Sequence, residues 1–119
     1  MQHKLFLKQF FQTINTHNVD AILEHFSEAA VVYYEGAEYR GPDNIRHWLE
    51  NANKQYNACH TVLNISFTDN EATAIVSVAG TFSGSPIQQT FYFIVEDYKI
   101  TSLNVGRNYI YPSEPRQME

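Results

Sequence analysis

Residues 39–49, Tyr39-Arg40-Gly41-Pro42-Asp43-Asn44-Ile45-Arg46-His47-Trp48-Leu49, contain the clearest helix start in this chain. Pro42 suits the first turn of a helix because an N–H has no partner there, and the helix dipole favours Asp43 beside it. The apolar residues that follow recur at helical spacing: they are Ile45, Trp48, Leu49, Ala52 and Tyr56. We therefore predict an amphipathic helix that ends near residue 56.

Two further helices and one strand are predicted upstream of this segment. Leu7, Phe10, Phe11 and Ile14 form an apolar stripe within residues 3–16. A shorter helix follows Asn18, whose side chain suits a helix N-cap. Residues 30–34 are mostly β-branched and aromatic and lead into the turn-rich residues 35–38, so we expect a strand there.

From residue 60 onward the pattern changes to strands separated by short turns. We expect strands at residues 61–67, 72–82, 88–95 and 100–106. Short connections favour an antiparallel meander. Helices that precede such a sheet indicate an α+β fold, here one domain over residues 1–110 with a polar tail at residues 111–119.

Composition narrows the class of protein. The 119 residues hold 13 acidic and 8 basic side chains, and the net charge of −5 opposes binding to a nucleic acid backbone. No apolar run approaches the roughly 20 residues that span a bilayer, so we expect a cytoplasmic protein that binds no membrane. The lone Cys59 supports neither an intramolecular disulfide nor a four-ligand zinc site. The aromatic content of 14% suits either an ample core or a ligand cavity.

Three stretches carry a likeness to a known family: residues 11–22, residues 26–31 (Phe26-Ser27-Glu28-Ala29-Ala30-Val31) and the segment 39–49 quoted above. Together they resemble the opening half of the nuclear transport factor 2-like superfamily, in its SnoaL-like, polyketide cyclase-like branch. The resemblance covers about residues 4–107. It implies a cone-shaped, curved antiparallel sheet packed on three N-terminal helices, as in the cystatin-like roll, with a pocket opening into the cone. It also implies a homodimer through the outer sheet face, for which Ile75, Ala79, Phe91 and Phe93 are candidates.

Strand alternation, combined with the resemblance, predicts which side chains line the cone. They are Phe10, Val32, Tyr34, Trp48, Val76, Val78, Gly80, Phe82, Thr90, Tyr92, Leu103, Val105 and Arg107. A single β-bulge would invert any of these sets.

His60 is the candidate catalytic residue. A pocket histidine is expected to titrate near neutrality and to move protons in either direction. Alternation puts His60 and Asn64 on one strand face, which is similar to a strand opening in dehydratase-like and cyclase-like relatives. The alternative is a surface or capped histidine at a strand end. The other histidines, His3, His17, His25 and His47, are expected on polar helix faces or in a loop, with His25 the first exception to consider.

The family's ketosteroid isomerases provide a negative inference. Tyr34 stands where the resemblance puts their general-base carboxylate, and Phe10 and Thr90 stand where they carry oxyanion-binding groups. Steroid-type isomerisation by that constellation is therefore excluded. Glu35 replaces the missing carboxylate only if a bulge shifts the strand register.

We expect a small, largely apolar ligand in the cone and, if the chain is an enzyme, cofactor-independent isomerisation, dehydration or cyclisation. His60 would serve as acid or base, Tyr34 or Tyr92 would orient the substrate, and Arg107 would hold an anionic oxygen. Tyr92 could equally be a packing residue, and Arg107 a rim residue paired with Glu35 or Glu38. We expect no cofactor and no metal. The alternative, a non-catalytic ligand-binding or dimeric interaction domain, stays open.

Overall fold

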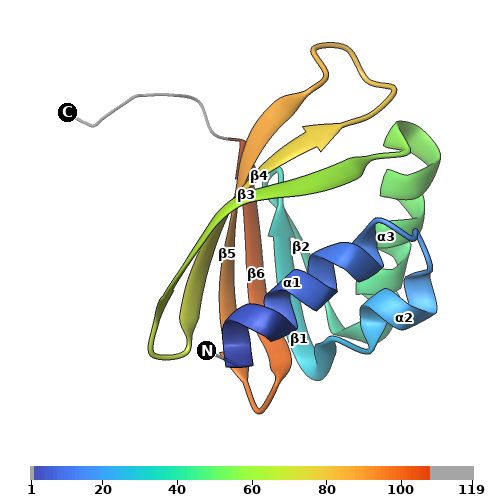
Figure 1. Ribbon diagram of the computed structural model, residues 1–119. Coiled ribbons are helices and arrows are strands. Elements are labelled where there is room, and N and C mark those ends of the chain that lie inside the picture. The colour runs from blue at the N-terminus through green and yellow to red at the C-terminus, as the bar shows by residue number, and fades with distance from the viewer. Residues whose placement is uncertain (1, 108–119) are drawn as a thin grey trace.

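The computed structural model describes residues 2–107, with the side chains of residues 4–54 and 57–106. In chain order the elements are α1 (Gln2–Ile14), α2 (Val19–Leu23), β1 (Phe26–Tyr34), β2 (Ala37–Arg40), α3 (Gly41–Tyr56), β3 (Cys59–Thr68), β4 (Glu71–Ala79), β5 (Ile87–Glu96) and β6 (Lys99–Arg107) (Figure 1). No described helix is both long and apolar enough to cross a bilayer. The polar tail expected at residues 111–119 lies outside the described residues.

The helices begin where the sequence predicts. The Asn18 side chain caps α2 by accepting a hydrogen bond from the Ala21 backbone N–H at 3.2 Å. Helix α3 has Pro42 and Asp43 in its first turn, and it ends at Asn57, whose φ of 45° is left-handed. These local signals fix how the chain enters and leaves each helix.

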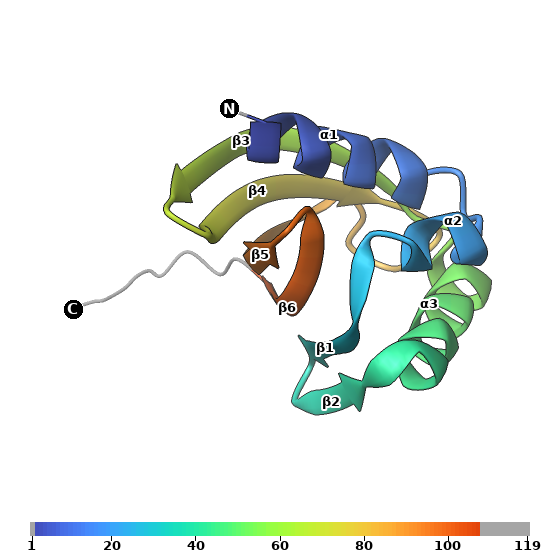
Figure 2. The same ribbon diagram turned by 90° about the horizontal axis from the view of Figure 1, so that it is seen from below.

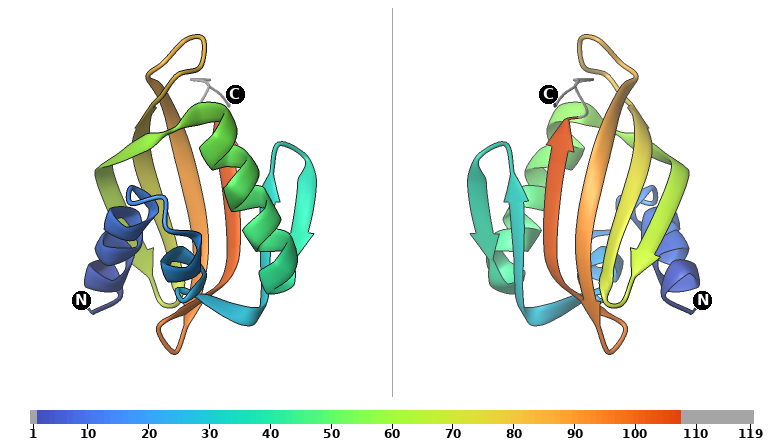
Figure 3. Two further views of the ribbon diagram at one scale, coloured as in Figure 1. Left: turned by 90° about the vertical axis from the view of Figure 1, so that its right-hand side faces the viewer. Right: turned by 90° about the vertical axis from the view of Figure 1, so that its left-hand side faces the viewer.

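Six strands form one mixed sheet in the order β2-β1-β6-β5-β4-β3. Strands β3 to β6 form the predicted antiparallel meander, whereas β1 pairs with β6 in parallel, so the expectation of a purely antiparallel sheet is wrong at that pair. The sequence reading also missed β2, which pairs with β1. All three helices lie on one face of the sheet (Figure 3), and the sheet curves around that face (Figure 2). The α+β cone is confirmed.

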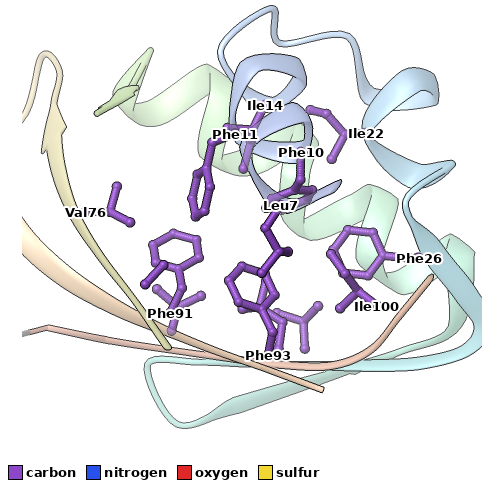
Figure 4. Packing of buried hydrophobic residues seen from close by; sticks show 14 of the residues in the cluster. Leu7, Phe10, Phe11, Ile14, Ile22, Phe26, Val76, Phe91, Phe93 and Ile100 are labelled. Atoms are coloured by element: carbon purple, nitrogen blue, oxygen red, sulfur yellow. The ribbon is translucent and has the colours of Figure 1, made fainter. Parts of the chain in front are cut away.

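The core forms where α1 meets β5 on the concave face (Figure 4). The ring centroids of Phe10 and Phe93 lie 5.7 Å apart, and those of Phe11 and Phe91 lie 5.2 Å apart. Edge-to-face contacts of this kind stabilise aromatic pairs beyond the area they bury. All four side chains are 2% exposed or less.

This packing reverses the predicted face of β5. The sequence reading turned Thr90 and Tyr92 inward and placed Phe91 and Phe93 outside, but Phe91 and Phe93 are the buried pair. In the antiparallel register, Ala74 and Ala72 of β4 stand opposite Phe91 and Phe93. The small alanines leave room for the two rings on the concave face, and all four of these side chains are buried there.

Candidate functional site

A cavity of about 150 Å³ lies inside the cone, between α3, the segment joining α1 to α2, and the concave face of the sheet. Its described apolar lining includes Ile14, Trp48, Leu49, Val78, Ile87 and Phe91. Its described polar lining consists of His17, Tyr34, Glu35, Asn53, His60, Ser83 and Gln89. An apolar pocket with a few polar groups is the usual form of a small-molecule site.

His60 is held at the start of edge strand β3 by Asn15. The backbone N–H of His60 donates to Asn15 Oδ1 at 2.7 Å, and Asn15 Nδ2 donates to the His60 carbonyl at 2.8 Å. The amide of Asn15 thus occupies both backbone hydrogen-bonding groups of His60, as a neighbouring strand would. The end of α1 therefore positions the predicted catalytic residue.

The His60 ring packs among aromatic side chains. It lies 5.8 Å from the Phe91 ring in an edge contact and 6.4 Å from the Phe11 ring. Its Nδ1 atom is buried and has no hydrogen-bond partner among the described residues. Burial, with a further contribution from the charge of His17, lowers the pKa of His60 to about 4. The expectation that this histidine titrates near neutrality is therefore wrong, and at pH 7 its imidazole is neutral.

His17 is a cavity residue that the sequence reading placed on a polar face. Its φ of 62° is left-handed, so it turns the chain after α1. His17 Nε2 lies 2.7 Å from the carbonyl oxygen of Ala58, and Asn53 Nδ2 donates to the His17 carbonyl at 3.3 Å. Because a carbonyl only accepts, His17 Nε2 carries a proton and donates it to Ala58. No local sequence signal separates this histidine from a loop histidine.

Tyr34 and Trp48 both line the cavity, as predicted. Their ring centroids lie 5.7 Å apart. The ring of Tyr39, a residue of β2, lies 6.2 Å from that of Trp48, again between centroids. Trp48 is 7% exposed, and its Nε1 atom is buried without a hydrogen-bond partner among the described residues. An indole N–H is only a donor, so this atom needs an acceptor.

Gln89 is the second cavity residue that sequence reasoning missed. It lines the cavity and is only 8% exposed. It is on the concave face because β5 has the opposite phase to the one predicted from Thr90 and Tyr92. Its amide adds both donors and an acceptor to the wall.

Glu35 is the carboxylate among the described lining residues. Tyr34 pairs with Ala37, so Glu35 and Gly36 form a two-residue turn, with φ of 51° and 81°. Left-handed backbone is uncommon for glutamate, and such strain recurs at functional sites. Glu35 reaches the rim through this turn, and it is exposed there.

Four predicted binding residues have other outcomes. Tyr92 is 52% exposed on the opposite face of β5, and Phe10 is a fully buried core residue outside the cavity lining. Asn64 is exposed because the register of β3 shifts between Val62 and Asn64, which breaks the alternation from His60. The Arg107 side chain lies outside the described residues.

Comparison with known proteins supports this fold. A family model described as SnoaL-like domain matches residues 7–103. A proposed polyketide cyclase from Sinorhizobium meliloti is 29% identical, with a TM-score of 0.80 over 84% of this chain and 92% of that chain. SalBIII, an epoxide hydrolase/cyclase-like enzyme with a role in pyran ring formation in the polyether salinomycin, is 20% identical, with a TM-score of 0.79 over 89% and 90%.

An uncharacterized cystatin fold protein from Novosphingobium aromaticivorans is 17% identical, with a TM-score of 0.75 over 90% of this chain and 99% of that chain. A comparison with curated proteins finds no match. The fold of this chain is thus similar to that of a solved cystatin fold protein, as the cystatin-like roll expected from the sequence predicts.

Proposed function

The chain belongs to the SnoaL-like domain family, and from this premise we propose that it binds a small, largely apolar molecule in the cone and catalyses cofactor-independent proton transfer on it. The observation that carries the proposal is the cavity of about 150 Å³, whose largely apolar wall also carries the polar side chains of Glu35, His60 and Gln89.

Proton transfer has two candidate residues on this lining. The Glu35 carboxylate accepts a proton from a carbon next to a substrate carbonyl, and the electron pair moves to the carbonyl oxygen. Neutral His60 donates its ring N–H to that oxygen, a role in which a lowered imidazole pKa is an advantage. Return of the proton from Glu35 to a different carbon completes an isomerisation.

The same enolate gives two further reactions. Loss of a hydroxyl from the neighbouring carbon, with the proton returned by Glu35, releases water and completes a dehydration. Attack of the enolate carbon on an internal carbonyl, which takes up the proton, closes a ring. The cyclase descriptions of the two relatives named above support ring closure among these.

Hydrogen exchange tests the proposal without knowledge of the natural substrate. Cyclohexanone in D₂O exchanges the hydrogens beside its carbonyl when a base abstracts them, and NMR follows the loss of signal. We expect exchange above the buffer rate in the wild type, a fall of about 100-fold in Glu35→Gln and of at least about tenfold in His60→Gln. Tyr92→Phe, on the opposite face, is the matched control and should exchange at the wild-type rate.

Binding without catalysis is the second candidate function. The observation that favours it is the pKa of about 4 for His60, which makes its imidazole a weak base at neutral pH. This function predicts that ligands raise the thermal stability while cyclohexanone exchanges only at the buffer rate. A ligand at a hundredfold excess over its dissociation constant adds about 2.7 kcal/mol to the free energy of unfolding. Absence of both stabilisation and exchange would contradict both candidates.

A further inference from the structure

A groove of about 530 Å³ lies outside the cone, between helix α1 and strand β3. Strand β3 is an outer strand of the sheet, and α1 lies beside it (Figure 2). One wall is a face of α1, with Lys4, Lys8, Phe11, Gln12 and Asn15, and the other wall is residues 60–65 of β3. Among the described residues, the groove shares only His60 with the lining of the cone cavity, so it is a separate site.

The outer edge of β3 carries backbone groups that the sheet does not pair. The Asn15 side chain takes the N–H and the carbonyl of His60, which shows that these groups face outward. Residues of an antiparallel strand bond alternately to one side and to the other. Val62 and Ile65 stand opposite β4 residues of the same parity as the partner of His60, so their backbone groups face outward too. No described backbone group from outside the sheet bonds to either residue.

The shape of the edge suits a short segment. The register of β3 shifts between Val62 and Asn64, and Leu63 at this bulge is 56% exposed. A bulge on an edge strand opposes pairing with a long, regular strand. The α1 wall from Lys4 to Asn15 is about 16 Å long, which corresponds to about five extended residues. Leu63 offers such a segment an apolar contact.

The charges of the groove indicate the chemistry of that segment. Lys4 and Lys8 are exposed on the α1 wall, and neither forms an ion pair with a described residue. The described lining contains no acidic side chain, although the chain carries a net charge of −5. An acidic segment therefore gains two ion pairs. A second copy, paired edge to edge about a two-fold axis, would bring its own lysines to the same groove, and like charges oppose this.

We propose that the groove between α1 and β3 binds a short, extended, acidic peptide segment of a partner protein. The segment adds a strand to the edge of β3 through the backbone of Val62 and Ile65, which is the β-augmentation mode of peptide recognition. Its carboxylates pair with Lys4 and Lys8. Exposed ion pairs contribute little each, so the backbone hydrogen bonds provide most of the affinity and the lysines select the acidic sequence. This binding is independent of the chemistry proposed for the cone.

A heptapeptide in which valine and glutamate alternate, acetylated and amidated at its ends, tests the proposal on the full chain. In ¹H–¹⁵N spectra the peptide should move the backbone N–H signals of Val62 and Ile65 downfield and slow their exchange with water at least about tenfold. Its affinity should fall about fivefold between about 50 mM and about 500 mM salt. The same peptide with lysine in place of glutamate should bind at least about tenfold more weakly.

Two controls separate charge from strand addition. Lys8→Glu should weaken binding of the glutamate peptide about fivefold, whereas Lys54→Glu, the same change at an exposed lysine in the last turn of α3, should alter it less than about twofold. N-methylation of alternate peptide amides removes the donors on one edge of the added strand at a time. One of the two methylated forms should bind at least about tenfold more weakly, while the other stays within about threefold.

Several results would overturn the proposal. They are failure of the glutamate peptide to bind, equal binding of the lysine peptide, and equal effects of Lys8→Glu and Lys54→Glu. Binding that survives both N-methylations would show attraction by charge alone and would refute strand addition. A dimer of the free protein in which the N–H groups of Val62 and Ile65 are already protected from exchange would assign the edge to a second copy instead.

Discussion

Acidification from pH 7 to pH 4.5 should destabilise the protein through His60. Burial first, and the charge of His17 second, lowers the pKa of His60 from its ordinary 6.5 to about 4 in the folded protein. In the unfolded chain the same group has a pKa of about 6.5. Between these two values the unfolded state binds more protons than the folded state, so stability falls as the pH falls. Above pH 6.5 both states are neutral and the effect is absent.

The size of the effect follows from the two pKa values. Each unit of difference corresponds to about 1.4 kcal/mol, so the drop in the pKa of His60 to about 4 limits the loss to about 3 kcal/mol. At pH 4.5 most of this, about 2.5 kcal/mol, should already be expressed. Domains of this size are commonly stable by about 5–15 kcal/mol, so the loss is a large fraction of the total.

Urea unfolding at pH 7.0 and pH 4.5 measures this loss in the wild type and in His60→Gln. Glutamine does not titrate, whereas the carboxylates titrate in both proteins and cancel in the comparison. The wild type should therefore lose about 2.5 kcal/mol more than the variant on acidification. Equal losses would refute the assignment of His60 as a buried, neutral group, as would a histidine ring proton that titrates near pH 6.5 at this position.

Three further predictions concern residues whose roles the structure separates. Asn15→Ala should lower the free energy of unfolding, measured in urea, by about 1–3 kcal/mol, because the backbone of His60 loses both of its hydrogen bonds to that side chain. The control Asn64→Ala, on the surface, should change this free energy by less than about 0.5 kcal/mol. Phe10→Ala should lower the free energy of unfolding by about 3–5 kcal/mol, while the affinity for cyclohexanone stays within about threefold. The reason is that Phe10 is a core residue outside the cavity lining. A large loss of affinity in a variant that still folds would contradict this prediction. We propose that two copies pair through the outer sheet face, where Tyr92 is 52% exposed, so light scattering should give a dimer mass for the wild type and a monomer mass for Tyr92→Lys; a wild-type monomer would contradict the pairing.

Features set by local chemistry could be predicted from the sequence. Pro42 and Asp43 mark the start of α3, and Asn18 caps α2, because both signals act within one turn of helix. The alternation of Val76 and Val78 on β4 gave the correct face because the strand is regular over that span. Tyr34 was predicted to line the cavity from strand alternation and Trp48 from the family resemblance, and both do line it.

Features that depend on partners distant in the sequence could not be predicted from the sequence. In β5, both phases of the strand carry large side chains, and the choice of Phe91 and Phe93 as the inner pair depends on the alanines of β4 opposite them. In β3, the register shift between Val62 and Asn64 turns Asn64 outward although two-residue spacing from His60 predicts the opposite. The sequence reading placed Tyr92 in the cavity and left Gln89 out of it. Both mistakes have one cause, because the face of the sheet on which each residue lies is set by the phase of β5.

The question that composition left open, whether the aromatic residues form a core or a ligand cavity, has both answers in the structure. Phe10, Phe11 and Phe93 pack in the core between α1 and β5, while Tyr34, Trp48, Phe82 and Phe91 line the cavity. Phe91 belongs to both regions: it stacks on Phe93 at 6.0 Å, contacts the His60 ring at 5.8 Å and lines the cavity. A ligand against Phe91 therefore packs on the same ring that α1 packs on. Binding should consequently raise the stability of the whole domain, which is why unfolding measurements can detect a ligand whose chemistry is not yet known.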